Sequence, residues 1–406
     1  MQHTKLQQKT ITISLASLFC STFSAAPMAE SVNDIFTDTH AKIDMRLRYE
    51  SVDQDNALKD ADALTLRTRF NFITGSYNGF SAVFELEDSR SVLGLDNYNN
   101  GNGSKSDYSV IADPETTELD QAFLQYINAD FRVKLGRQVI ALDGQRFVGH
   151  VGWRQDKQTF DAVSAIYQPL KELKLTYAYV TQRNRIFAEQ KDIDASDHLL
   201  NAAYITPIGT LTGYAYLLEA DNGSDNGLDT WGASFAGQSQ WNETSVNYRF
   251  EYASQDADNG ASSFSADYLA AEAGINLAVV DIKLGYESLG SDKGQYGFAT
   301  PLATLHKFNG WSDQFLSTPT VGLNDVYASI GGKVMGGQWN LIYHDFSADK
   351  ASSTVDDLGN EINALFSKKL DDHFSAGTKL ARYSAGDAPA GKVDTDKIWL
   401  WLGASF

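Results

Sequence analysis

The chain ends in KIWLWLGASF, residues 397–406, and this stretch decides the fold. Its alternate positions form one apolar face, made of Ile398, Leu400, Leu402, Ala404 and Phe406. Because successive side chains of a strand point to opposite sides, a period of two over this length indicates a β-strand. An amphipathic strand that closes the chain with an aromatic residue is typical of bacterial outer-membrane barrels.

The same alternation recurs through the chain, most clearly in residues 41–50, 64–72, 246–252 and 280–286. In each segment apolar side chains share one face, and charged or small side chains share the other. A soluble β-sandwich also alternates in this way, so it remains an alternative. Segments of about ten residues, however, suit a tilted membrane-crossing strand better than a soluble strand of five or six.

The connections between these segments alternate between short and long. The short ones are 75–79, 128–130, 168–172, 206–209, 237–240, 278–279, 336–337 and 371–373. The long, polar ones are 53–60, 88–117, 143–157, 184–197, 221–227, 255–265, 290–322, 347–358 and 384–395. Tight turns on one side and long loops on the other are the pattern of a transmembrane barrel. We therefore predict an all-β fold, a transmembrane antiparallel β-barrel of about 18 strands (16–18).

Composition excludes several other classes of protein. The 406 residues carry 33 basic and 52 acidic side chains, a net charge of −19, which argues against a nucleic-acid partner. The 22 Phe and 19 Tyr favour strands. After the N-terminus there is no uncharged apolar run of 18 residues, so a bundle of membrane helices is excluded.

The N-terminus has the order of a secretory signal. Lys5 and Lys9 precede an apolar stretch over residues 11–26, which is too short to serve comfortably as a membrane anchor. We predict a signal peptide over residues 1–29, a short periplasmic N-terminal segment over 30–40 and an outer-membrane barrel over 41–406. The only cysteine, Cys20, lies in the signal, so the mature chain has no disulfide.

At this point the sequence resembles the alginate export family of outer-membrane porins. The resemblance rests on LRTRFNF (66–72), TGSYNGFSAVFELE (74–87), ADPETTELDQAFLQY (112–126), LGRQVIALDGQRFVGHVGWRQDKQTFDAV (135–163) and WLWLGASF (399–406). It is dense over about residues 62–165, and beyond them mainly the strand rhythm matches. It implies one 18-stranded barrel with an arginine-rich lumen through which an anionic polysaccharide crosses the outer membrane. Mapped by motif, the implied lumen residues are Arg67, Arg69, Arg137, Arg146 and Arg154.

The arginines themselves are unevenly placed, since eleven of the 13 lie at or before position 185. Two pairs, Arg46 with Arg48 and Arg67 with Arg69, have the spacing that puts both members on one strand face. Guanidinium groups bind carboxylates bidentately and keep their charge, so such a wall suits anionic cargo. The candidate lumen residues are Arg46, Arg48, Arg67, Arg69, Arg132, Arg137, Arg146 and Arg154.

Two questions about this wall stay open at the level of sequence. The arginines can instead pair with wall acids such as Asp44, Glu50, Glu85 and Glu87 and brace the barrel. The loop over residues 143–157, which mixes cations with Trp153, can fold inward as a constriction or stand exposed at the rim.

Motifs for catalysis or metal binding are missing from the sequence. There is no H-E-x-x-H and no G-x-S-x-G, and residues 221–227, DNGSDNG, lack the spacing of an EF-hand. His344 and Asp345 are adjacent on a predicted strand and must face opposite sides. We therefore expect no catalytic residues, no metal site and no cofactor.

These patterns predict a porin in the bacterial cell outer membrane. It would give a water-filled passage to anionic saccharides, such as alginate-like polyuronates or oligosaccharides, or to other small carboxylates. The expected partners are outer-membrane lipid, this cargo and the barrel-assembly machinery, which would read the C-terminal strand. The alternatives are a barrel hydrolase acting at the cell surface and a secreted β-sandwich that binds carbohydrate.

Overall fold

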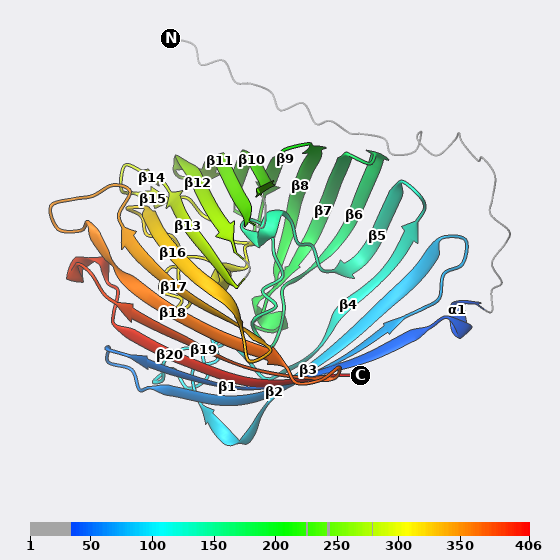
Figure 1. Cartoon of the computed structure of the whole chain (residues 1–406), viewed down its shortest axis with the longest axis horizontal. Helices are drawn as coiled ribbons and strands as arrows, with labels where there is room; N and C mark the ends of the chain where they lie inside the picture. Colours follow the sequence, from blue (N-terminus) through cyan, green and yellow to red (C-terminus); the bar gives the residue numbers. More distant parts are fainter. Residues whose placement is uncertain (1–33, 225, 242–243, 278) are drawn as a thin grey trace, which may run out of the picture.

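The computed structural model describes residues 34–224, 226–241, 244–277 and 279–406 (Figure 1). The predicted signal peptide, residues 1–29, lies outside the described residues, and so does the start of the predicted 30–40 segment. A single helical turn, α1 (Asp34–Thr37), precedes the first strand. Within the described ranges, no helix is long and apolar enough to span a membrane.

Eighteen strands make up one sheet, and two further two-residue strands lie in a loop. The strands of the sheet are β1 (His40–Gln54), β2 (Ala61–Ile73), β3 (Phe80–Asn97), β4 (Thr116–Ile127), β5 (Phe131–Gln138), β6 (Thr159–Leu170), β7 (Leu173–Asn184), β8 (Ile193–Thr206), β9 (Gly209–Leu218), β10 (Gly227–Trp241), β11 (Thr244–Asp258), β12 (Ser263–Asn276), β13 (Val280–Leu289), β16 (Leu323–Val334), β17 (Gly337–Ser347), β18 (Asp357–Lys369), β19 (Phe374–Ser384) and β20 (Thr395–Ser405). The loop strands are β14 (Ser291–Asp292) and β15 (Tyr296–Gly297).

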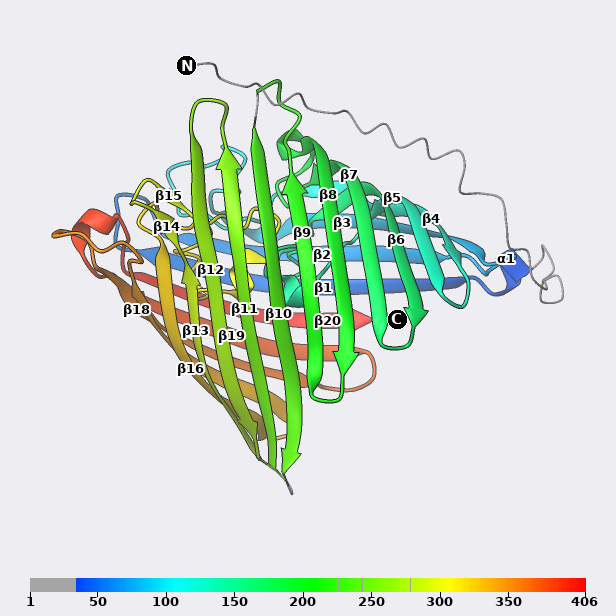
Figure 2. The ribbon, with the colours of Figure 1, turned by 90° about the horizontal axis from the view of Figure 1, so that it is seen from above.

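The sheet closes on itself because β1 pairs with β2 on one side and with β20 on the other. Every neighbouring pair is antiparallel; at the closure Arg46 lies opposite both Arg67 of β2 and Gly403 of β20. In Figure 2 the strands of the near wall cross β1, β2 and β20 of the far wall at a steep angle, as tilted barrel strands do. The predicted 18-stranded barrel is confirmed, and the β-sandwich alternative is wrong.

The predicted alternation of β20 separates the two faces of the wall. Leu400 and Leu402 are 50% and 55% exposed, whereas Lys397 and Trp399, on the other face of β20, are 4% and 0% exposed. Apolar side chains therefore face outward, where lipid replaces water, and polar or bulky ones face inward. Closure leaves no strand edge in the hydrocarbon layer, where an unpaired backbone group is costly.

Most of the predicted connections lie where the alternation put them, and the loop over residues 290–322 has its predicted bounds. The turn predicted at residues 237–240 is wrong, because these residues lie inside β10 and pair with β11. Gly237 is there for packing: a Cβ at this position would lie 2.6 Å from the ring of Tyr248, its partner on β11. A glycine followed by polar residues is typical of a turn, but here the glycine leaves room for the Tyr248 ring within the strand pair.

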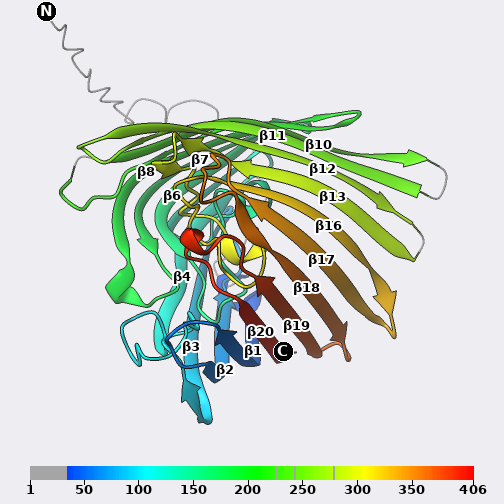
Figure 3. The same cartoon turned by 90° about the vertical axis from the view of Figure 1, so that its left-hand side faces the viewer.

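Two of the long loops fold into the barrel (Figure 3). We call residues 139–158, between β5 and β6, loop A, and residues 290–322, between β13 and β16, loop B. Phe147 of loop A and Phe298 of loop B belong to one buried apolar cluster with the inward side chains Tyr214 and Tyr268. The apolar core of this protein therefore sits inside the barrel, between the two loops and the wall.

Candidate constriction inside the barrel

Four arginines lie together on the inner wall, and we call Arg46, Arg48, Arg67 and Arg69 the arginine quartet. Arg46 and Arg67 are directly opposite each other across β1 and β2. Arg48 and Arg69 follow two residues further along their strands and so keep the same face. Arg48 is 1% exposed and Arg67 is 5% exposed, which for strand residues of a barrel means that they point inward and are covered.

Three members of the quartet are paired with carboxylates. Arg67 forms an ion pair with Asp44, Arg69 with Glu87, and Arg48 with Asp113. These pairs hold β1, β2 and β3 together along the inner face and fasten the loop that carries Asp113. The pairing of arginines with wall acids is therefore present in the structure.

Arg46 differs from the other three because it makes no ion pair with a carboxylate of any described residue. Its guanidinium donates instead to loop A, through Nε to Gln155 Oε1 at 3.0 Å and Nη2 to the Trp153 carbonyl at 2.9 Å. Loop A therefore crosses the lumen directly over the quartet. The guanidinium of Arg46 is therefore met by backbone and amide dipoles and not by a direct ion pair with a described carboxylate.

The two arginines of loop A reach opposite walls. Arg154 bonds to both carboxylate oxygens of Glu50 on β1, at 3.1 and 3.0 Å, and to Asp313 of loop B at 2.8 Å. Arg146 bonds to Glu287 on β13 at 2.7 Å. Loop A is thus anchored at both ends by buried, hydrogen-bonded charge pairs, the geometry in which a guanidinium is most strongly held. Of the two arrangements that the sequence leaves open for this loop, the structure shows the inward one.

The other two predicted lumen arginines do not join the quartet. Arg137 lies on the outer face of β5, two residues from the exposed Leu135, and pairs with Asp161 of β6 at 2.8 Å. The prediction that Arg137 lines the lumen is wrong for this reason. Arg132 lies at the opposite end of β5, next to the turn at residues 128–130, and is exposed there.

Loops A and B hold each other in the middle of the barrel. Val148 and Leu302 form a β-bridge, and Gln158 Nε2 donates to the Leu302 carbonyl at 3.0 Å. Thr304 Oγ1 donates to Gln145 Oε1 at 2.6 Å. Because both loops are buried and bonded to each other, they form one constriction rather than two separate flaps.

Aromatic rings and a histidine complete the constriction beside the quartet. Trp153 of loop A stacks on His306 of loop B, with ring centroids 5.4 Å apart and planes at 6°. Lys379 Nζ lies 4.5 Å from the Trp153 ring centroid and 3.8 Å from that of Trp311. Cations held over aromatic faces in a desolvated site attract the rings strongly. Trp153 is thus part of the packing between the loops and the wall.

The sequence identified loop A but missed the partners that complete the site. His306, Asp313, Glu287 and Lys379 come from loop B and from the far wall, more than 100 residues from loop A. No motif or spacing links such residues, because only barrel closure brings them together. The one sequence feature that pointed to these partners was the length and polarity of loop B, whose bounds were predicted correctly.

With the barrel and its constriction described, comparison with known proteins places the chain. Residues 39–287 match the model of the family described as alginate export, which is more than half of the chain. The chain belongs to the alginate export family. No match in sequence was found among the curated proteins.

Solved structures resemble this member of the alginate export family in fold. OccAB1 of Acinetobacter baumannii superposes with a TM-score of 0.71 at 13% identity, covering 93% of this chain and 99% of that one. OccK9 of Pseudomonas aeruginosa gives 0.71 at 12% identity, covering 92% and 99%. OpdK of Pseudomonas aeruginosa, solved with vanillate, gives 0.66 at 12% identity, covering 90% and 98%. The protein is an outer-membrane, porin-like β-barrel.

Proposed function

We propose that this barrel is a porin whose constriction favours anionic cargo, namely uronate-bearing saccharides or other small carboxylates. The observation that carries the proposal is Arg46, a guanidinium on the inner wall with no ion-pair partner among the described carboxylates. An uncompensated charge in a narrow, low-dielectric passage enriches counter-ions there. Arg67 lies directly opposite Arg46, and Arg48 and Arg69 lie on either side of this pair along the wall, each of the three paired with a carboxylate.

Two compounds named with the family and with a similar structure support a carboxylate cargo. Alginate, which names the family, is a polyuronate, so each of its sugar units carries a carboxylate. Vanillate, named with the structurally similar OpdK, is a small aromatic carboxylate. A guanidinium wall suits both, because its planar fork matches the two oxygens of a carboxylate.

The alternative of a barrel hydrolase gains no catalytic base from His306, the histidine at the constriction. His306 uses both ring nitrogens, Nδ1 with Asp313 at 2.6 Å and Nε2 with Lys379 at 2.7 Å. It therefore has no ring nitrogen left to accept a proton from a serine nucleophile, as the triad mechanism requires. The transport proposal uses the same residues without any chemical step.

Uptake into proteoliposomes tests the proposal. The wild-type barrel is expected to pass a trisaccharide of uronic acids faster than a neutral trisaccharide of similar size. Arg46→Gln is expected to remove this preference, because it deletes the uncompensated charge and frees no carboxylate. Arg137→Gln, which changes an arginine on the outer face, is the matched control and should keep the preference. Equal rates for both sugars through the wild-type barrel would contradict the proposal.

A further inference from the structure

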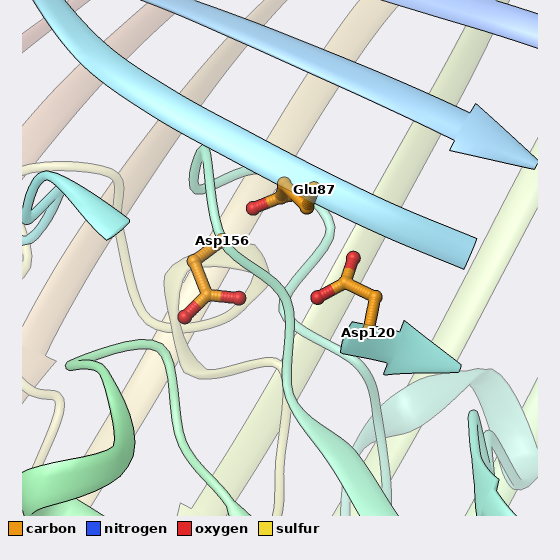
Figure 4. A group of neighbouring side chains, drawn as sticks. All are labelled: Glu87, Asp120 and Asp156. Carbon is orange, nitrogen blue, oxygen red and sulfur yellow. The ribbon is translucent and has the colours of Figure 1, made fainter. Parts of the chain in front are cut away.

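Three carboxylates from three different elements meet in the interior next to the quartet (Figure 4). Glu87 comes from β3, Asp120 from β4 and Asp156 from loop A, and we call them the carboxylate triad. One oxygen from each lies within 4.8 Å of the others. All three side chains are buried, with exposed fractions of 1%, 3% and 1%. Like charges at this separation in a buried site repel one another strongly.

Within the part of the chain that the structure describes, each member of the triad also has a buried oxygen that accepts no hydrogen bond. These oxygens are Glu87 Oε1, Asp120 Oδ2 and Asp156 Oδ2. Asp120 Oδ2 lies 3.3 Å from Lys157 Nζ and 3.4 Å from Arg69 Nε but accepts a hydrogen bond from neither. Asp156, carried in by loop A, turns its carboxylate toward the two wall residues (Figure 4). Buried carboxylate oxygens left unsatisfied are costly, so one such oxygen on each of three clustered carboxylates indicates a missing partner.

The charges around the triad give the sign and size of that partner. Two cations contact the site: Arg69 pairs with Glu87, and Lys157 pairs with Glu85. With Glu85 there are four carboxylates against these two cations, so the groups in direct contact carry an excess of two negative charges. A divalent cation would balance them.

The ligand atoms indicate which class of ion fits. All three are carboxylate oxygens, with no sulfur or imidazole, which is the ligand set of hard cations. Ca²⁺ takes six to eight oxygens in flexible geometry, whereas Mg²⁺ requires a near-ideal octahedron. Three carboxylates from a loop and two strands, each able to bind through one or two oxygens, suit the more permissive ion.

We propose that Glu87, Asp120 and Asp156 bind one Ca²⁺ ion, which fastens loop A to the wall at β3 and β4. A pocket of about 530 Å³ near the start of β4 is lined by Glu115 and Glu118 among others. Glu118 is two residues from Asp120 on β4 and adds a further carboxylate near the triad along that strand. The inference goes beyond the proposed transport function, since ion binding is measured without any cargo.

Calcium binding to the mature full-length barrel, refolded in detergent without lipopolysaccharide, tests the site directly. Equilibrium dialysis against ⁴⁵Ca²⁺ is expected to give one ion per wild-type chain. Asp156→Asn keeps the shape of the side chain but removes a ligand charge, and should weaken binding at least tenfold. Asp88→Asn is the matched control, because Asp88 neighbours Glu87 but lies on the outer face of β3 beside Arg90. It should bind as the wild type does.

Thermal unfolding adds a readout that a merely structural aspartate would not give. In chelator, Asp156→Asn should melt at or above the wild-type temperature, since it relieves repulsion within the triad. On addition of Ca²⁺ the wild-type midpoint should rise, while that of the variant should stay in place, so the order of the two reverses. The proposal is overturned if the wild type takes up no Ca²⁺ at millimolar concentration, or if Asp156→Asn binds and responds as the wild type does.

Discussion

His306 of loop B accepts a hydrogen bond from Lys379 of β19, with 2.7 Å between Nε2 and Nζ. Its other ring nitrogen, Nδ1, lies 2.6 Å from Asp313 Oδ1 and donates to it. This arrangement requires a neutral ring, because a proton on Nε2 would point at the Lys379 ammonium. Burial accordingly lowers the pKa of His306 to about 3, although Asp313 opposes this shift.

The first prediction concerns stability at acid pH. Because the folded pKa of His306 is near 3 and an unfolded histidine titrates near 6.5, the unfolded chain binds more protons between these values. The contribution of neutral His306 to the free energy of unfolding is therefore complete above pH 6.5 and is lost as the pH falls below that value. Lowering the pH from 6.5 to 4.5 should cost roughly 2–3 kcal/mol, measured by thermal unfolding in detergent.

Substitution separates this histidine from the other titrating groups. His306→Asn retains one donor and one acceptor, so its unfolding midpoint should fall less than that of the wild type over the same pH range. Asp313 does not contribute there, because the hydrogen bond from His306 and the charges of Lys397 and Arg154 overcome the effect of burial and hold its pKa well below the usual range. His40→Asn, at the exposed start of β1, serves as the control and should fall as the wild type does. Equal slopes for all three proteins would contradict the prediction.

The second prediction concerns topology. Residues 103–107 in the loop between β3 and β4 are exposed, and they include Lys105. Loop A carries three basic residues, but Arg146, Arg154 and Lys157 are all buried in the barrel. Trypsin added to intact cells should therefore cut at Lys105 and spare loop A, as mass spectrometry of the fragments would show.

Lys105→Gln is the control for that experiment and should remove the cut. A cut at Lys171, in the turn between β6 and β7, would mean that the short turns face outside and would invert the orientation. Exposed loops are the usual sites of proteolysis, whereas buried, bonded loops resist it.

How far the sequence predicts this structure can be seen from single residues. Alternation in residues 397–406 gives the outward face of β20, because a lipid-facing wall demands apolar residues at every second position. Arg137 was misplaced because a family motif does not specify a strand face, although alternation with Leu135 does. Asp120 and Asp156 gave no signal, since their meeting depends on where loop A lies after the barrel has closed.

The third prediction concerns the terminal residue. Phe406 exchanges two backbone hydrogen bonds with Ile43, of 3.0 and 2.9 Å, and stacks on His373 with centroids 5.1 Å apart. Deleting it should lower the amount of folded barrel in the outer membrane several-fold, because the assembly machinery is expected to read this terminal strand. The amount is measured by heat-modifiable gel mobility of isolated membranes.

A stability measurement distinguishes recognition from simple weakening. His373→Ala removes the stacking partner but leaves the terminal aromatic in place. If recognition of Phe406 matters, the deletion should assemble far less well than His373→Ala at similar stability in detergent. Normal surface levels of the truncated chain would contradict the prediction.

The last prediction concerns ionic selectivity. The whole chain has a net charge of −19, which by itself would favour cations. Charges in bulk-exposed loops are screened within about 8–10 Å at physiological salt, whereas those at a constriction are screened less. Arg46 lies at the constriction and has no ion-pair partner among the described residues, so the wild-type pore should prefer anions weakly in a reversal-potential measurement across a salt gradient.

Variants of the quartet should shift this potential in a graded order. Arg46→Gln removes one charge and should bring the preference close to zero. Arg67→Ala with Arg69→Ala removes two charges and frees Asp44 and Glu87 from their ion pairs, so the pore should become cation-selective. Arg67→Gln combined with Asp44→Asn removes an ion pair without changing the net charge, and it should keep the wild-type potential. Because position rather than total charge sets this order, a cation-selective wild type, or a double arginine variant with unchanged potential, would contradict the assignment of the quartet to the passage.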